Sequence, residues 1–190
     1  MSHFDTGRIS ADWLPKAGTK WCEYEKKGLE IRRLAGCQDS DRLDPYRLAE
    51  ILRFRVIPFS RIEGLSPEVV NILIQEDQWS GAALEIPEDG TRLIIINDRQ
   101  SPNRQRATLM EEITHLILGP PPSLIRPAGR SYQKHVEEEA YAIGAASLVP
   151  FKALSEMLSA GHSLTKIARW FDVSNALVES RMKVLGLWKD

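Results

Sequence analysis

The chain has 190 residues, of which 43% are hydrophobic and 27% are charged. This length suits one well-buried core with at most a small appended module, and the composition excludes a disordered or collagen-like chain. The 25 lysines and arginines and 26 aspartates and glutamates give a formal net charge of −1 at pH 7. We therefore expect no global attraction to nucleic acid or to an anionic membrane.

The cysteines and the apolar segments predict a cytoplasmic protein without a membrane span. Cys22 and Cys37 do not form a CxxC pair, and in a reducing compartment we expect both to be free thiols. Charges are scattered through the first 30 residues, which contain no apolar segment typical of export. The longest mostly apolar stretch, residues 140–151, is far shorter than the roughly 20 residues that cross a bilayer.

The first predicted elements are two helices and a strand. Residues 20–34 predict a polar, charge-rich helix. Asp44 as N-cap and Pro45 at the first helical position predict a second helix over 46–53. Residues 55–59 predict a short strand, whose proline places it at the edge of a sheet.

A hairpin and further helices are predicted next. Residues 81–86 and 92–96 have strand character and flank a turn at Asp89 and Gly90. Ser101 as N-cap, Pro102 at the first position and Gly119 at the end delimit a well-marked helix. Another helix is expected over about 132–148, followed by three short helices with breaks at 161–163 and 172–174.

The helix that starts at Pro102 carries the residues with the most distinctive chemistry. It contains an EExxH motif, in the run Thr108-Leu-Met-Glu-Glu-Ile-Thr-His115. Glu111 and His115 stand four residues apart and project from one face, and Glu112 lies one step round. The opposite face is apolar, so the motif fits either a solvated face of an amphipathic helix or a metal site.

A glutamate on the next helix favours the metal site. On a helical wheel Glu139 lies among apolar residues, whereas Glu137 and Glu138 point away. An ionised carboxylate in an apolar setting costs several kcal/mol unless it meets a cation. We therefore expect Glu139 to be buried and to have a positive partner.

Two kinds of partner for this carboxylate remain open. A divalent metal shared with Glu111 and His115 would satisfy it, and so would a salt bridge to an arginine such as Arg104 or Arg106. His135 lies on the same side of its helix, and it is either a further ligand or a surface histidine.

In their order along the chain these motifs resemble the ImmA/IrrE family of metallopeptidases. The resemblance spans about Leu43 to Pro150 and rests on the Asp44-Pro45 helix, the Val56 strand, Ile94-Ile-Ile-Asn97, Arg104, the EExxH segment, Glu139-Ala140 and Leu148-Val-Pro150. It implies an α+β, zincin-like domain in which a small sheet packs on the motif helix.

The resemblance also implies roles for individual residues. Members usually carry HExxH on the first helix, so His115 corresponds to the second histidine ligand, Glu112 to the catalytic base and Glu139 to the carboxylate ligand. Glu111 stands where the family has its first histidine. The implied metal is Zn²⁺, and the extra oxygen ligand makes Mn²⁺ an alternative. Loss of the metal altogether is the remaining option.

The C-terminal segment 164–187 resembles a helix-turn-helix unit. From residue 161 onward, five basic and three acidic side chains give a net charge of +2, which is weak for a phosphate-binding surface. A packing role is therefore favoured over DNA binding. In the resembled family the partner is often a helix-turn-helix repressor that the peptidase cleaves.

These observations predict three segments and one principal function. The segments are an N-terminal helical part (1–42), a metallopeptidase-like domain (43–155) and a helical extension (156–190). The function is that of a metal-dependent endopeptidase, of full or weakened activity, acting on a repressor. A catalytically inactive module that binds a repressor or DNA is the alternative. The strand over 81–86 is either an edge that pairs with the substrate or simply one arm of a hairpin.

Overall fold

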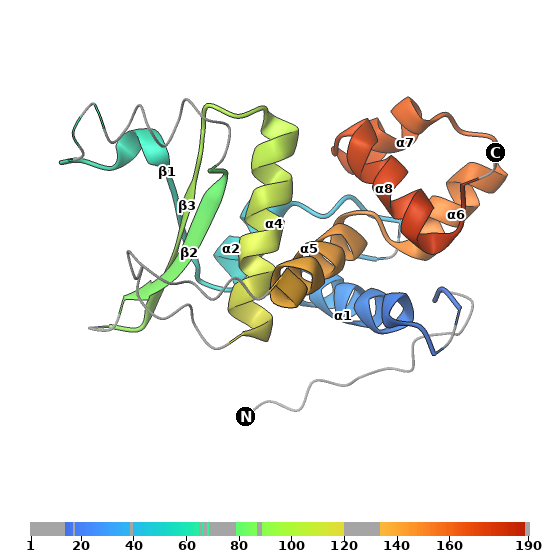
Figure 1. The fold of residues 1–190 in the computed structure, drawn as a ribbon, viewed down its shortest axis with the longest axis horizontal. Coiled ribbons are helices and arrows are strands. Elements are labelled where there is room, and N and C mark those ends of the chain that lie inside the picture. The colour runs from blue at the N-terminus through green and yellow to red at the C-terminus, as the bar shows by residue number, and fades with distance from the viewer. Residues whose placement is uncertain are drawn as a thin grey trace.

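The computed structural model describes residues 14–16, 18–38, 40–64, 66, 68, 79–86, 89–119 and 134–188. A small sheet lies on one side of the molecule and helices pack on the other (Figure 1). In chain order the elements are α1 (Lys20–Leu34), α2 (Pro45–Ile51), β1 (Arg55–Pro58), the 3₁₀ turn η2 (Phe59–Arg61), β2 (Gly81–Ile86), β3 (Thr91–Ile96), α4 (Pro102–Leu118), α5 (Lys134–Leu148), α6 (Phe151–Ser159), α7 (Leu164–Phe171) and α8 (Asn175–Leu185).

The sheet has the strand order β1-β3-β2, so β1 and β2 form its two edges. β1 is parallel to β3, and β2 is antiparallel to β3. Pro58 therefore lies in an edge strand, as predicted, where its missing N–H costs no central ladder bond. The predicted turn is also present, since the Thr91 N–H donates to Asp89 Oδ1 at 2.8 Å and Gly90 has a φ of 70°.

One hydrophobic core joins the sheet, the central helices and the C-terminal helices. It includes Ile94 and Ile96 of β3, Ile113 of α4 and Ile143 of α5, all almost fully buried. The core continues through α7 and α8, where Phe171 is buried. The C-terminal helices therefore have the packing role that the sequence favoured.

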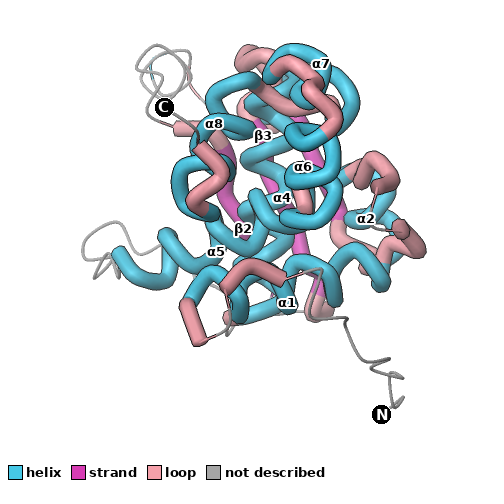
Figure 2. Tube along the Cα trace, turned by 90° about the vertical axis from the view of Figure 1, so that its right-hand side faces the viewer, coloured by secondary structure: helices cyan, strands magenta, loops and turns pink. Residues whose placement is uncertain are grey.

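Helix α5 lies between α1 and α4 (Figure 2), and small residues permit the close approach on both sides. Gly28 of α1 faces Ala146, where an added Cβ would lie 2.9 Å from the Ala146 Cβ and 3.0 Å from the Ser147 nitrogen. Gly144 faces α4, and its missing Cβ would lie 3.5 Å from the backbone at Met110 and Glu111. The position of α5 is thus set by backbone contact rather than by long side chains.

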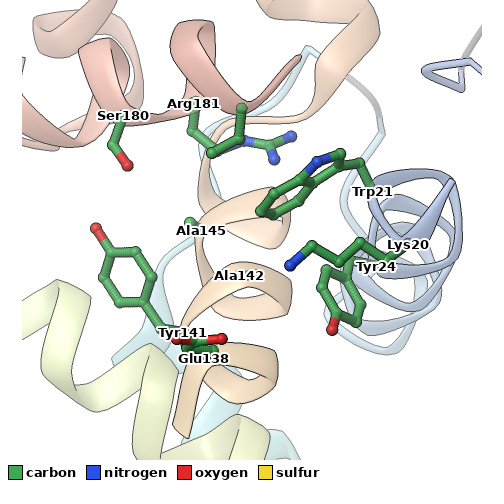
Figure 3. A pocket seen from close by; sticks show the side chains of 10 residues that line it. Lys20, Trp21, Tyr24, Glu138, Tyr141, Ala142, Ala145, Ser180 and Arg181 are labelled. Carbon is green, nitrogen blue, oxygen red and sulfur yellow. The ribbon is translucent and has the colours of Figure 1, made fainter. Parts of the chain in front are cut away.

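A buried ion pair ties α1 to α8. Glu25 and Arg181 are almost inaccessible to solvent, and the Arg181 guanidinium donates to the Glu25 carboxylate. The same guanidinium donates through Nε to the Val149 carbonyl at 3.1 Å, and the Phe151 N–H donates to Glu25 at 2.5 Å. Beside this pair, α1, α5 and α8 line a pocket of about 310 Å³ that is open to solvent on one side, and the rings of Trp21 and Tyr141 form part of its wall (Figure 3).

The predicted elements agree closely with the described ones. Each predicted helix and strand is present, with ends that differ by one or two residues; residues 132 and 133 lie outside the described part. The N-caps at Asp44 and Ser101 each accept a backbone N–H of their helix. Cys22 and Cys37 are free, as predicted. Among the described residues, every helix is too short or too polar to cross a membrane.

The close contact between α1 and α5 gives a first prediction. Gly28→Ala places a methyl group against backbone atoms of α5, and we expect a loss of about 1–2 kcal/mol after the gain in helix propensity is subtracted. Gly144→Ala is the matched control, because its methyl group has ordinary contact distances, and it should be neutral or stabilising by up to about 1 kcal/mol. Urea unfolding followed by circular dichroism measures the free energy of unfolding of both variants. Equal stability of the two would contradict the close contact between α1 and α5 at Gly28.

The buried ion pair gives a second prediction. Arg181→Met leaves the Glu25 carboxylate buried without its cation, and we expect a loss of about 3–5 kcal/mol in the free energy of unfolding. The double variant Glu25→Leu, Arg181→Met removes both charges and should recover part of that loss. If the double variant is as unstable as the sum of the two single variants, the two residues are not coupled.

Candidate metal centre

Helix α4 presents Glu111 and His115 together because its other face is anchored in the core. Leu109, Met110 and Ile113 are fully buried, and this fixes the rotation of the helix. The Ser101 hydroxyl caps its N-terminus by accepting from the Arg104 N–H, and Pro102 occupies the first turn. Glu111 and His115 then lie on the face that is turned away from the core.

Helix α5 adds a third donor, and that donor is Glu137. The ligand atoms of Glu111, His115 and Glu137 all lie within 4.8 Å of one another, and Nε2 of His115 lies 3.0 Å from Oε2 of Glu137. All three side chains are partly buried. This is the only group of three or more metal-binding side chains at such distances in the described part of the chain.

The electrostatics of this cluster favour a cation. Burial raises the pKa of the Glu111 carboxyl, the nearby Glu137 charge raises it further, and the Arg104 guanidinium opposes these effects. Ionising Glu111 in the absence of a cation therefore costs free energy. One imidazole and two carboxylates are a donor set that suits Zn²⁺ or Mn²⁺. The residues present thus fit a divalent metal.

The structure does not bring Glu139 into this cluster. Its side chain is 33% exposed, contrary to the expectation that it is buried, and its carboxylate accepts from Lys27 Nζ of α1 at 2.6 Å. Glu139 does have a positive partner, but that partner is neither of the proposed arginines. Arg106 instead forms ion pairs with Asp44 and Asp172.

The helical-wheel argument predicted the wrong environment for Glu139 because α5 packs against other helices on two sides. A helix packed against both α1 and α4 has no single apolar arc, so apolar neighbours do not identify which glutamate faces which helix. Glu137, Ala140 and Gly144 form one stripe, and Gly144 lies against α4. The small residues Ala140 and Gly144, which share a face of α5 with Glu137, are the signal in the sequence that could have identified Glu137.

The two other candidates lie near the cluster but outside it. Glu112 is partly buried on α4, next to Glu111, and is not among the three clustered side chains. His135 is exposed at the start of α5 and also lies outside the cluster, which agrees with a surface histidine. The assignment of Glu112 as catalytic base stays a prediction.

Comparison with known proteins adds an independent finding. A family model described as Peptidase M78, IrrE N-terminal-like domain, matches residues 68–183, which is more than half of the chain. The matched segment includes α4 and α5 and extends into α8. It confirms the resemblance to the ImmA/IrrE family and the α+β, zincin-like fold class. No curated protein matches the chain.

The cluster gives a third prediction, on metal binding. Added Zn²⁺ or Mn²⁺ should raise the melting temperature of metal-free protein, with about 2.7 kcal/mol of stabilisation at a hundredfold excess over Kd. Glu137→Gln should weaken this response because it removes a ligand, whereas Glu139→Gln should retain it because it removes only the partner of Lys27. Differential scanning fluorimetry with elemental analysis measures the response. A retained response in Glu137→Gln and a lost one in Glu139→Gln would reverse the assignment.

Proposed function

The chain belongs to the peptidase M78 family with the IrrE N-terminal-like domain, and from that membership we propose that it is a metal-dependent endopeptidase. The observation that carries this proposal is the convergence of Glu111, His115 and Glu137 from two crossing helices. These three side chains would hold the metal. When bound, a divalent cation supplies Lewis acidity, which polarises a peptide carbonyl and lowers the pKa of water.

The proposed ligands are already arranged by their own contacts. Glu137 holds the His115 imidazole by the 3.0 Å contact at Nε2. Histidine binds metal as the neutral imidazole, and this contact already places the ring beside the Glu137 carboxylate, a second potential ligand. Metal binding also relieves the repulsion between the Glu111 and Glu137 carboxylates. The site is therefore expected to be more stable loaded than empty.

Glu112 is the proposed general base. Its carboxylate takes a proton from the attacking water as the new C–O bond forms, and it gives that proton to the amine nitrogen as the C–N bond breaks. Supporting this role are its place beside Glu111 on α4 and its match to the second position of the family's usual HExxH motif. A partly buried glutamate in such a site has the restricted water access that proton transfer needs.

The outer edge of β2, with which no other strand of the described residues pairs, is the proposed binding surface for the substrate backbone. β2 is an outer strand of the sheet and packs beside α4, and an added Cβ at Gly81 would lie 2.7 Å from the Thr108 side chain. An extended peptide that pairs with this edge would be held over the exposed face of α4. The proposed substrate is a helix-turn-helix repressor in the cytoplasm, and the substrate's identity rests on the family resemblance alone.

A specific observation keeps a second function in view. The ligand set contains Glu111 in place of an imidazole, so Zn²⁺ would sit in a formally neutral site instead of one with a charge of +1. Such a site would acidify water less than one with a charge of +1, and hydrolysis would be slower. The alternative function is a peptidase-like module that binds a repressor without cleaving it.

The proposed base gives a fourth prediction. Glu112→Gln should lower cleavage of a proteome-derived peptide library by about 10²–10⁴-fold, because it removes the group that moves the proton. Metal content should be unchanged, because Glu112 lies outside the cluster. Glu138→Gln, an exposed glutamate on α5, is the control and should cleave like the wild type.

Mass spectrometry of the products and elemental analysis of each variant decide the outcome. Cleavage retained by Glu112→Gln would exclude this residue as the base. A wild-type protein that binds metal stoichiometrically but cleaves nothing would favour the non-catalytic module.

A further inference from the structure

We propose that Arg104 is a specificity-determining residue that binds an acidic side chain of the substrate, on the C-terminal side of the scissile bond. This inference rests on the proposed peptidase function and deepens it by naming the substrate class. Arg104 lies at the N-terminal end of α4, where Arg99, Gln100, Ser101 and Arg104 line a hollow of about 510 Å³. The hollow lies at the N-terminal end of the helix that carries Glu111 and His115.

The first observation is an excess of hydrogen-bond donors. Nε and Nη2 of Arg104 both donate to the Ser80 hydroxyl, at 3.3 and 3.0 Å, and Nε2 of Gln100 donates to the same oxygen at 3.1 Å. A hydroxyl oxygen has two lone pairs, so three donors converge on an acceptor that satisfies two. A carboxylate, with two oxygens and about four acceptor sites, suits this arrangement better.

The second observation is the charge at the hollow. The hydrogen bonds described for the Arg104 side chain go to the neutral Ser80 hydroxyl, and Arg104 is exposed. Arg99 has the Asp98 carboxylate as a neighbour, and that carboxylate accepts from the Ser60 N–H and hydroxyl. Among the described residues at this end of α4, two guanidinium groups and one carboxylate leave a net positive charge. The Arg104 charge also acts on the Glu111 carboxylate, but the hydrogen bonds described for its guanidinium go to a neutral acceptor, so this solvent-accessible group is suited to a bidentate pair with an incoming carboxylate.

The third observation is the position of Arg104 relative to the metal ligands. Arg104 and Glu111 are seven residues apart, so they lie on one face of α4 about 10 Å apart along its axis. An extended peptide rises about 3.3 Å per residue. A substrate centred on the metal would therefore place a side chain at Arg104 about three residues from the scissile bond.

The direction of the substrate follows from the direction of β2. Gly81, at the start of β2, lies against Thr108, whereas Arg92, the register partner of Glu85, donates to the Leu116 carbonyl near the end of α4. β2 and α4 therefore run side by side in the same sense. A peptide paired antiparallel to β2, the more favourable pairing, has its C-terminal part toward Arg104.

Cleavage-site profiling tests this inference. Metal-loaded wild type, Arg104→Gln and Arg47→Gln are incubated with the same proteome-derived peptide library, and the products are identified by mass spectrometry. Arg47, an exposed arginine on α2, is the matched control. We expect enrichment of Asp and Glu about three residues after the cleaved bond in the wild type and in Arg47→Gln. Arg104→Gln should lose the enrichment, with kcat/KM falling at least tenfold for acidic peptides and little for their amide counterparts.

A binding measurement separates this inference from the proposed function. Fluorescein-labelled peptides that differ only by Glu or Gln at that position are titrated against metal-loaded Glu112→Gln, with and without Arg104→Gln, by fluorescence anisotropy. Tighter binding of the Glu peptide that depends on Arg104 supports the subsite even if the wild type cleaves nothing. Cleavage without acidic enrichment, or enrichment that persists in Arg104→Gln, overturns the subsite and leaves the peptidase function intact.

Discussion

The close packing of α5 between α1 and α4 is the constraint on which the rest of the structure depends. Gly28 meets Ala146 on one side, where an added Cβ would be too close, and Gly144 lies against the backbone of α4 on the other, where a single methyl group would make ordinary contact. Because interiors are densely packed, this contact leaves little freedom in the rotation of α5. That rotation decides which of the three consecutive glutamates at its N-terminal end meets His115.

The same packing gives two glutamates different environments. Glu137 faces α4 and joins two potential metal ligands, whereas Glu139 faces α1 and pairs with Lys27. The side chains of Lys27 and Glu139 are each about one-third exposed or more, so their ion pair contributes little to stability. The Glu137 position is costly in the absence of metal, because Glu111 carries a like charge beside it. The chain thus places two neighbouring carboxylates where a cation can bind.

Most of the fold follows from local signals in the sequence. Asp44-Pro45 and Ser101-Pro102 determine where two helices begin, because a cap and a proline act within one turn. Pro58 identifies an edge strand by the same local reasoning. The partner of His115 depends instead on how two helices cross, which is a tertiary property. Helix α5 is packed against α1 on one side and against α4 on the other, so apolar residues surround Glu139 on the helical wheel without showing which helix it faces. The helical wheel therefore placed Glu139, which faces α1, in the metal-binding cluster.

The exposed face of α4 combines two opposite electrostatic demands. Its middle carries Glu111 and His115, which require a cation, and its N-terminal end carries Arg104, which faces a neutral hydroxyl. A cation held by Glu111, His115 and Glu137 would neutralise the middle of this face and leave the positive charge at its N-terminal end. An extended peptide on this face would then meet a polarising centre at one point and a guanidinium about three residues further on. The charge pattern along a single helix therefore gives the site a direction, which a metal centre alone does not have.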